Sequence, residues 1–124
     1  MNPEIKDKWV AALRSGKYEQ AQGRLHRISK DNQHSYCCLG VLCELALEDG
    51  VDLKITRMGN ADGDWVRYDN DSGFPSAQVM NWAGFVADDP ARVRADWLKV
   101  KGLANLNDDG RSFDYIADYI TESL

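Results

Sequence analysis

The most reactive side chains of this 124-residue sequence lie close together in one short segment. Cys37, Cys38 and Cys43 all fall in the run 35–46, and His34 directly precedes that run. A thiol in the first turn of a helix is activated because free backbone N–H groups and the helix dipole stabilise its thiolate. Cys37 and Cys38, with His34 as the base, are therefore candidate catalytic residues.

The order of these residues favours packing over catalysis. Papain-like enzymes take their histidine from downstream of the cysteine, whereas His26 and His34, the two histidines of this chain, both precede Cys37. Cysteine is also among the residue types most often buried, and it then behaves as a small apolar group. We therefore interpret the cysteine segment mainly as core, with a cysteine-dependent enzyme as the alternative.

The spacing of the histidines and cysteines does not match a metal site. Structural zinc sites usually combine a Cys-x₂₋₄-Cys knuckle with a second ligand pair, whereas Cys38 and Cys43 fall within one predicted helix. The run 69–73 begins like a calcium loop, but Phe74 and Met80 occupy the positions that require glycine and glutamate. The sequence therefore predicts no metal and no other cofactor.

Three of the four tryptophans are candidates for binding a partner. Trp9 lies on the face of a predicted helix and is interpreted as core, whereas Trp65, Trp82 and Trp97 border predicted turns. Tryptophan combines a large apolar surface with an N–H donor and is enriched in binding hot spots. We predict that Trp65, Trp82 and Trp97 are partner-binding residues; the alternative is that they fill the core.

Composition narrows the classes of partner and the compartment. The formal net charge of −5 and the isoelectric point near 4.9 disfavour nucleic acid, because an acidic protein repels the phosphate backbone. No apolar run approaches the roughly 20 residues that span a bilayer, and the first residues lack the apolar core of a signal peptide. We therefore expect a cytoplasmic protein with reduced thiols and no membrane contact.

Capping residues and apolar periodicity predict the helices that would position these side chains. Asparagine and serine caps accept hydrogen bonds from the free N–H groups of a first turn, and glycine ends a helix in a left-handed conformation. Helices are expected over residues 3–15, from an N-cap at Ser35 to Asp49, from Ser76 to Gly84 and from Ser112 onward, with a further helical turn at 103–107. The second is expected to be the core helix, because its apolar residues recur at helical spacing: Leu39, Leu42, Cys43 and Ala46.

Alternating apolar residues predict a small antiparallel sheet. Residues 51–56 alternate apolar and polar side chains, and the run 65–68, which follows a turn-rich segment, indicates a returning strand. Residues 17–32 are expected to form a short strand or an irregular arm. Residues 91–101 fit either a strand or the start of a helix, and we favour a strand because alternate residues there are apolar.

Together these elements predict one α+β domain over residues 1–124. Its small antiparallel sheet is expected to pack against three or four helices. A chain of this length can bury about two-thirds of the surface that its unfolded form exposes, so neither a disulfide nor a metal is needed to hold the fold.

Three blocks of the sequence carry a resemblance to a known group. They are Trp-x₃-Leu-Arg-Ser-Gly at residues 9–16, Tyr-Cys-Cys-Leu-Gly-Val-Leu-Cys at residues 36–43 and Leu-Asn-Asp-x-Gly-x-Ser-Phe at residues 106–113. In these blocks the chain resembles small accessory proteins of tailed bacteriophages. The resemblance implies a protein made inside the infected bacterium, and it assigns no functional residues.

These observations predict a non-enzymatic binding protein that acts on a host or phage component. Inhibition of a host enzyme or defence factor is one form this activity could take, and a protein partner is favoured over nucleic acid. Two alternatives stay open: a small enzyme that uses Cys37 or Cys38 with His34, and a protein that sequesters a small-molecule ligand.

Overall fold

The computed structural model describes residues 1–85 and 90–124 and has an α+β fold, which confirms the predicted class. Within that range it contains a four-stranded sheet and five helices, where three or four helices were expected. The helices are α1 (Pro3–Arg14), α2 (Cys38–Glu48), α3 (Ala77–Trp82), α4 (Pro90–Asp108) and α5 (Phe113–Ser123). The strands are β1 (His26–Ile28), β2 (His34–Tyr36), β3 (Ile55–Asn60) and β4 (Gly63–Tyr68).

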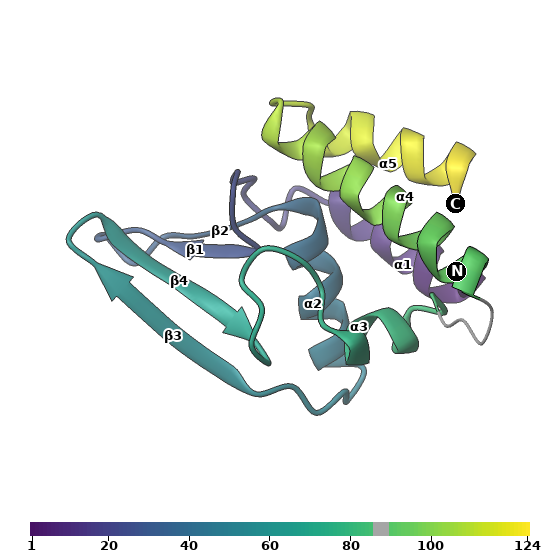
Figure 1. Cartoon of the computed structure of the whole chain (residues 1–124). Helices are drawn as coiled ribbons and strands as arrows, with labels where there is room; N and C mark the ends of the chain where they lie inside the picture. Colours follow the sequence, from purple (N-terminus) through teal and green to yellow (C-terminus); the bar gives the residue numbers. More distant parts are fainter. Residues whose placement is uncertain (86–89) are drawn as a thin grey trace.

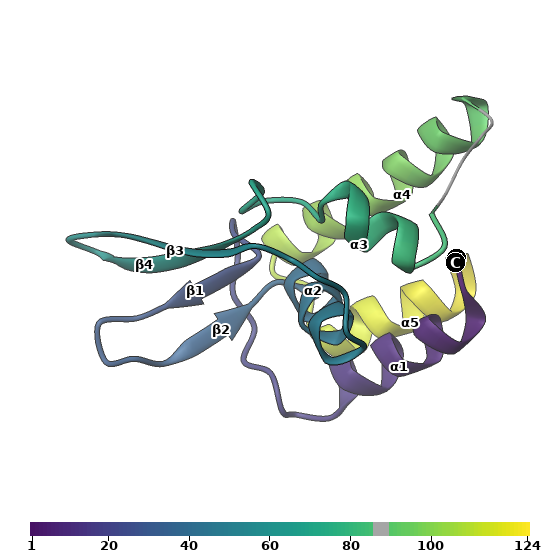
Figure 2. The same ribbon diagram turned by 90° about the horizontal axis from the view of Figure 1, so that it is seen from below.

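The sheet extends to one side of the helices, with α2 next to it (Figures 1 and 2). Helix α2 contacts α1, α3, α4 and β2, so it lies at the centre of the molecule. Helices α1 and α5 run side by side in both views and pack against each other. The hairpin of β3 and β4 reaches farthest from the helices (Figure 1).

The four strands pair in the order β2-β1-β4-β3, and all three pairings are antiparallel. Arg27 of β1 is paired with Ser35 of β2 and with Trp65 of β4, so these three side chains share one face of the sheet. The neighbouring residues His26 and His34 therefore point to the opposite face. We call these the arginine face and the imidazole face.

Helix α2 is the core helix, as predicted. Leu39, Leu42, Cys43 and Ala46 have no exposed surface, and they pack with buried residues of the other helices. The predicted N-cap was wrong, because Ser35 lies in β2 and the cap is Cys37, whose Sγ accepts a hydrogen bond from Gly40 N at 3.4 Å. The pairing of β2 with β1 keeps the backbone extended, so the helix cap lies two residues later than local capping preferences indicate.

Asn107 joins α4 to the start of α2 and to the arm that precedes β1. Its side chain is fully buried, and its Oδ1 accepts hydrogen bonds from Cys38 N at 3.2 Å and from Gln20 Nε2 at 2.9 Å. Its Nδ2 donates to the carbonyl of Ala21 at 2.7 Å. These bonds use three of the four hydrogen-bonding positions of the buried amide, and the bond from Cys38 also satisfies a free N–H at the start of α2. The arm itself is mostly irregular and contains β1, in agreement with the prediction for residues 17–32.

Close packing of this arm on α2 requires glycine at position 40. A Cβ atom added to Gly40 would overlap the backbone carbonyl of Leu25, which cannot move away as a side chain could. Leu25 and Gly40 are therefore in direct backbone contact, and this contact sets the distance between the start of the sheet and the core helix.

The strand favoured for residues 91–101 was wrong. This range lies within α4, which is one continuous helix and also includes the turn expected at 103–107. Val100, Leu103 and Asn107 are buried at helical spacing in its second half. Over a short window, alternating apolar residues are compatible with either a strand or a helix. The helical spacing of the buried residues identifies this element as a helix.

The predicted hairpin is present, but its boundaries differ. Strand β3 begins at Ile55 and continues to Asn60, whereas the strand was expected over residues 51–56. Asn60 pairs with Gly63, so the connection is a two-residue turn and not the longer loop expected from the polar composition. Gly63 has φ of 136°, a conformation that glycine adopts readily.

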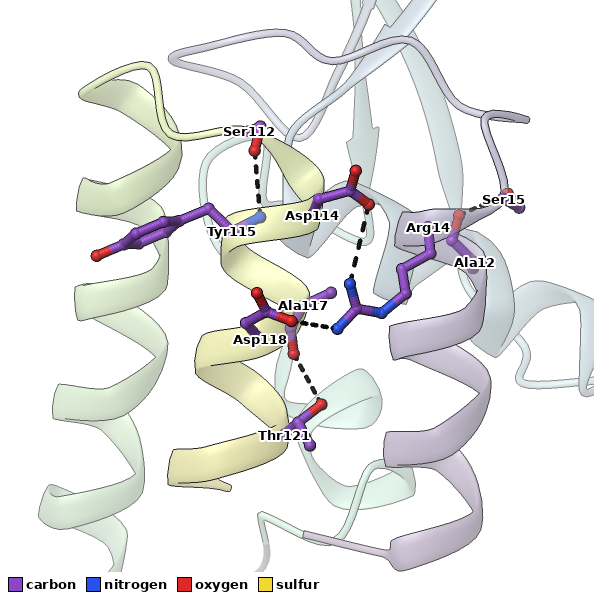
Figure 3. Close-up of polar contacts among 9 residues, drawn as sticks. All are labelled: Ala12, Arg14, Ser15, Ser112, Asp114, Tyr115, Ala117, Asp118 and Thr121. Carbon is purple, nitrogen blue, oxygen red and sulfur yellow. Dashed lines mark hydrogen bonds and ion pairs between the residues drawn. The ribbon is translucent and has the colours of Figure 1, made fainter.

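The other predicted helices are confirmed by their caps. Asn2 caps α1, Ser76 caps α3 and Ser112 caps α5. Figure 3 shows Ser112 Oγ accepting a hydrogen bond from the backbone N–H of Tyr115. The same view shows Arg14 at the end of α1 forming ion pairs with Asp114 and Asp118, which link α1 to α5.

Candidate functional site

The three cysteines are part of the core. Cys38 and Cys43 are fully buried, and Cys37 is 5% exposed. Burial raises the pKa of Cys37 to about 11, and it raises the pKa values of Cys38 and Cys43 well above the usual value. The only side-chain hydrogen bond recorded for Cys38 Sγ in the described part of the chain is to the carbonyl of Leu103, at 3.6 Å. These thiols stay protonated at neutral pH, which removes the basis for a cysteine nucleophile.

His34 is paired with His26 and not with a cysteine. The Nδ1 atom of His34 lies 2.7 Å from Nε2 of His26, and the two rings are tilted at 42°. Among the described residues, neither histidine forms a hydrogen bond with Cys37 or Cys38. The proposed catalytic set of Cys37, Cys38 and His34 therefore does not come together as a site.

The two histidines belong to a cluster of polar side chains on the imidazole face. His26 Nδ1 lies 2.9 Å from the hydroxyl of Tyr68, and the His26 ring stacks on Tyr36 with centroids 4.2 Å apart. Glu44 of α2 accepts a hydrogen bond from the Tyr36 hydroxyl at 3.4 Å, and its charge also acts on Tyr68. We call these five residues the imidazole cluster.

Burial controls the ionisation of this cluster. His26 is 6% exposed, and desolvation, followed by repulsion from His34 and Arg57, lowers its pKa to about 4. Desolvation raises the pKa of Glu44, while the hydroxyl groups of the two tyrosines act in the opposite direction. Desolvation and the nearby Glu44 raise the pKa of Tyr36 to about 12 and also raise that of Tyr68. At neutral pH the cluster therefore contains a neutral His26 and two protonated tyrosines.

A cleft of about 310 Å³ lies beside the imidazole cluster. Its walls are largely apolar, and Ile55 on its rim is 49% exposed. Arg57 supplies a guanidinium group whose Nε donates to Asp64 Oδ2 at 2.6 Å. The residues that line this imidazole cleft are His26, Ile28, His34, Glu44, Leu47, Ile55, Arg57, Val66 and Tyr68.

A second cleft, of about 350 Å³, lies on the arginine face. The Arg24 guanidinium stacks on the ring of Trp65, 4.1 Å from its centroid. The indole Nε1 of Trp65 is buried and has no hydrogen-bond partner among the described residues. Such a donor costs about 1–3 kcal/mol while it remains unpaired. This arginine cleft is lined by Arg24, Arg27, Ile28, Ser29, Ser35, Asn60, Asp62, Gly63, Asp64 and Trp65.

The other two candidate tryptophans have different surroundings from Trp65. Trp82 donates its indole N–H to Asp49 Oδ2 at 2.7 Å and lines a further cleft with Lys8 and Leu45. Trp97 of α4 is 41% exposed, and its ring lies 5.0 Å from that of Phe74. Of the three, Trp65 is the one whose N–H is buried without an acceptor in the described structure.

Sequence reasoning missed most of the imidazole cluster. His26 was considered as a metal ligand, while Tyr36, Glu44 and Tyr68 were assigned no role. Strands β1 and β2 have three residues each and give only a weak local signal, and it is their pairing that places His26 opposite Tyr36. The contact with Tyr68 is long-range and has no comparable local signal.

Neither a cluster of metal ligands nor a membrane-spanning helix is present among the described residues. In residues 1–85 and 90–124 there is no group of three or more His, Cys, Asp and Glu side chains placed to hold a metal ion. None of the described helices has the length and hydropathy needed to cross a bilayer.

The fold and its clefts define the chain as a small single-sheet α+β protein with a polar cleft on one face of the sheet and a histidine-containing cleft on the other. The chain belongs to the family described as Domain of unknown function (DUF8296), whose model matches residues 1–124. None of the curated proteins and none of the solved structures gave a significant match.

Proposed function

We propose that this protein is a binding protein that holds a segment of a partner protein in the arginine cleft. The observation that carries the proposal is the buried indole N–H of Trp65, which has no acceptor among the described residues, in a ring on whose face the Arg24 guanidinium stacks. A carboxylate or carbonyl oxygen that reaches the edge of this ring would satisfy the donor, and the neighbouring guanidinium could pair with the same group.

Arg24 is held in place by contacts that a ligand can replace. Its Nη1 atom donates to Ser72 Oγ at 3.2 Å, and its guanidinium otherwise rests on the Trp65 ring. Arg27 lies nearby, with its Nε donating to the carbonyl of Gln22 at 2.8 Å. Arginine and tryptophan are the residue types that most often dominate the binding energy of protein interfaces.

The charges of the cleft favour a protein segment over nucleic acid. Asp62 and Asp64 line the same cleft as Arg24 and Arg27, so a continuous row of phosphates would meet both signs of charge. A peptide with acidic and basic side chains can pair with both. The net charge of −5 also disfavours nucleic acid, because it repels a polyanion at longer range.

The resemblance to phage accessory proteins supports a partner inside an infected bacterium. We propose a host or phage protein in this role, and inhibition of a host enzyme or defence factor as the result of binding. The partner acts through an acidic side chain, since the unsatisfied groups of the cleft are donors.

The test compares two variants of the cleft with a matched control. Trp65→Phe removes the indole N–H but keeps a ring, and Arg24→Gln removes the guanidinium. Tyr115→Phe is the control, because it removes a hydrogen-bond donor from an exposed aromatic side chain of α5 that also stacks with an arginine and does not line the cleft. Each protein would be immobilised and exposed to lysate from phage-infected bacteria, and retained proteins would be identified and purified.

The expected result is one protein retained by the wild type and by Tyr115→Phe. With the purified partner, each cleft variant should weaken binding at least about tenfold, the loss expected when a hot-spot contact is removed. Equal affinity of all four proteins would overturn the proposal. So would retention that disappears on nuclease treatment, because the bound species would then be nucleic acid.

A further inference from the structure

One edge of the sheet is covered and the other is free. On the outer side of β2, Tyr36 N donates to the carbonyl of Glu19 at 2.8 Å, and Ala21 N donates to the carbonyl of Tyr36 at 2.7 Å, so the arm that precedes β1 covers this edge. The outer side of β3 forms no backbone hydrogen bond with any other described segment, and Figure 1 shows no other segment alongside it. Such an edge offers unpaired N–H and C=O groups to another strand.

The pairing with β4 shows which backbone groups of β3 are unpaired. Asn60 and Gly63 flank a two-residue turn, so they form a hydrogen-bonded pair, and such pairs alternate with non-hydrogen-bonded pairs along an antiparallel ladder. Tyr68 agrees with this alternation, because its N–H donates to the carbonyl of Asp71 at 2.8 Å, away from β3. The β3 residues whose N–H and C=O groups point to the free edge are therefore Ile55, Arg57 and Gly59.

The side chains near this edge leave room for a second backbone and supply both signs of charge. Gly59 lies opposite Asp64 of β4, and a Cβ atom at Gly59 would overlap the Asp64 carboxylate. The carboxylate therefore occupies the space above Gly59, where it accepts a hydrogen bond from Arg57 Nε at 2.6 Å. Glycine within a strand often marks a place where another backbone approaches closely. The Arg57 side chain is 52% exposed and has further N–H donors to offer.

We propose that β3 pairs with β3 of a second copy of this chain, antiparallel and about a two-fold axis that passes between the two Met58 residues. In this register Arg57 of each copy lies opposite Gly59 of the other, so the backbone groups that point to the free edges bond with each other. Each Arg57 guanidinium then lies next to the Asp64 carboxylate above that glycine. Two four-stranded sheets thus join into one, and two ion pairs link the copies.

Charge selects this register over the neighbouring ones. An axis through Arg57 would place the two arginines directly opposite each other, and like charges in that position are destabilising. An axis through Thr56 would place Arg57 opposite Ile55 and form no ion pair with Asp64. An axis through Gly59 would leave only one hydrogen-bonded pair between the two β3 strands. A second copy is favoured over an unrelated strand, because it supplies both the arginine and the matching aspartate.

The first test is the oligomeric state of the wild-type protein. A single pair of strands is at the low end of interface sizes, so we expect a reversible dimer with a dissociation constant on the order of 0.1 mM. Sedimentation up to about 1 mM would measure it. Hydrogen exchange at the Arg57 and Gly59 amides should slow as the protein concentration rises, because these N–H groups become paired only in the dimer.

Two charge reversals separate contacts between chains from the contact within a chain. Arg57→Asp leaves two acidic side chains at the edge and Asp64→Arg leaves two basic ones, so each variant should dimerise at least about tenfold more weakly than the wild type. In an equimolar mixture both ion pairs between chains are restored, whereas the pair within each chain stays broken. The mixture should therefore form heterodimers with about wild-type affinity.

Arg67→Asp is the matched control, because it makes the same change at an exposed arginine of β4, away from the free edge. It should dimerise like the wild type, and it should not restore dimers of Asp64→Arg in a mixture. Circular dichroism checks that each variant is folded. Arg24→Gln, which changes the arginine cleft, should also dimerise like the wild type, so this inference and the proposed function succeed or fail separately.

A wild-type protein that stays monomeric to about 1 mM, with exchange at Arg57 and Gly59 independent of concentration, would overturn the inference. A mixture of the two charge reversals that associates no better than either variant alone would also overturn it. If Arg57→Asp instead reduced the capture of a protein from infected lysate, the occupant of the β3 edge would be a strand of that partner and not a second copy.

Discussion

At the scale of single residues, burial decides which of the potentially reactive groups can react. The pKa of Cys37 rises from 9.0 to about 11, which lowers its thiolate fraction at neutral pH about 100-fold. We expect a thiol-specific disulfide reagent to modify the native protein at least about 100-fold more slowly than the unfolded protein. Time courses in buffer and in denaturant would measure this ratio. Rapid labelling of one thiol in the native protein would show that the cysteine segment opens.

His26 should make the stability of the protein depend on pH. Its pKa is about 4 in the folded protein and near 6.5 when unfolded, so the unfolded state binds the proton more tightly. The free energy of unfolding should therefore fall as pH decreases from about 6.5 to 4, by up to about 3 kcal/mol. Urea denaturation across this range would measure the slope. His26→Gln lacks the titrating group, so its slope should be smaller; an identical slope would assign the effect to other groups.

At the scale of elements, α2 should contribute the most to stability for its length. Leu42 is fully buried at the centre of this helix. Leu42→Ala should lower the free energy of unfolding by about 2–5 kcal/mol, because it removes apolar contacts and leaves a cavity. Leu98→Ala is the control, since Leu98 is 58% exposed, and it should cost less than about 0.5 kcal/mol. Chemical denaturation of both variants tests the assignment, and equal stability would contradict it.

Local sequence signals predicted helices better than strands in this chain. The caps at Asn2, Ser76 and Ser112 are read from neighbouring residues, and all three are present. Strands β1 and β2 have three residues each, which is too short for an alternation to stand out. Their existence depends on pairing with each other and with β4, which no local pattern encodes.

The difference between local signals and long-range pairing also explains how much of the candidate site was predictable. Trp65 and His34 could be selected by residue type, because tryptophan and histidine are common in binding sites. Their neighbours could not be selected in this way. Tyr68 contacts His26 across 42 positions of the sequence, and its importance appears only when β1 and β4 are paired.

At the scale of the whole molecule, net charge should affect the rate of association with a partner. The proposed interface combines two arginines with two aspartates in a protein whose net charge is −5. Salt screens exposed charges beyond about 8 Å at physiological ionic strength. If the partner is basic overall, apart from the acidic side chain that enters the cleft, raising the salt concentration should slow association more than it changes dissociation. Surface plasmon resonance at several salt concentrations would separate the two rates. A salt effect confined to dissociation would contradict this expectation.

Strands β1 and β4 carry residues of both clefts: His26 and Arg27 are neighbours on β1, and Trp65 and Val66 are neighbours on β4. An occupant of either cleft therefore contacts the same two strands. If occupancy of one cleft changes the affinity of the other, thermodynamics requires the effect to be reciprocal and equal in free energy. An occupant of the imidazole cleft that weakened partner binding fivefold would itself be bound fivefold more weakly by the complex. A small molecule bound on one face of the sheet would then regulate the binding of a protein on the other face without contacting that protein.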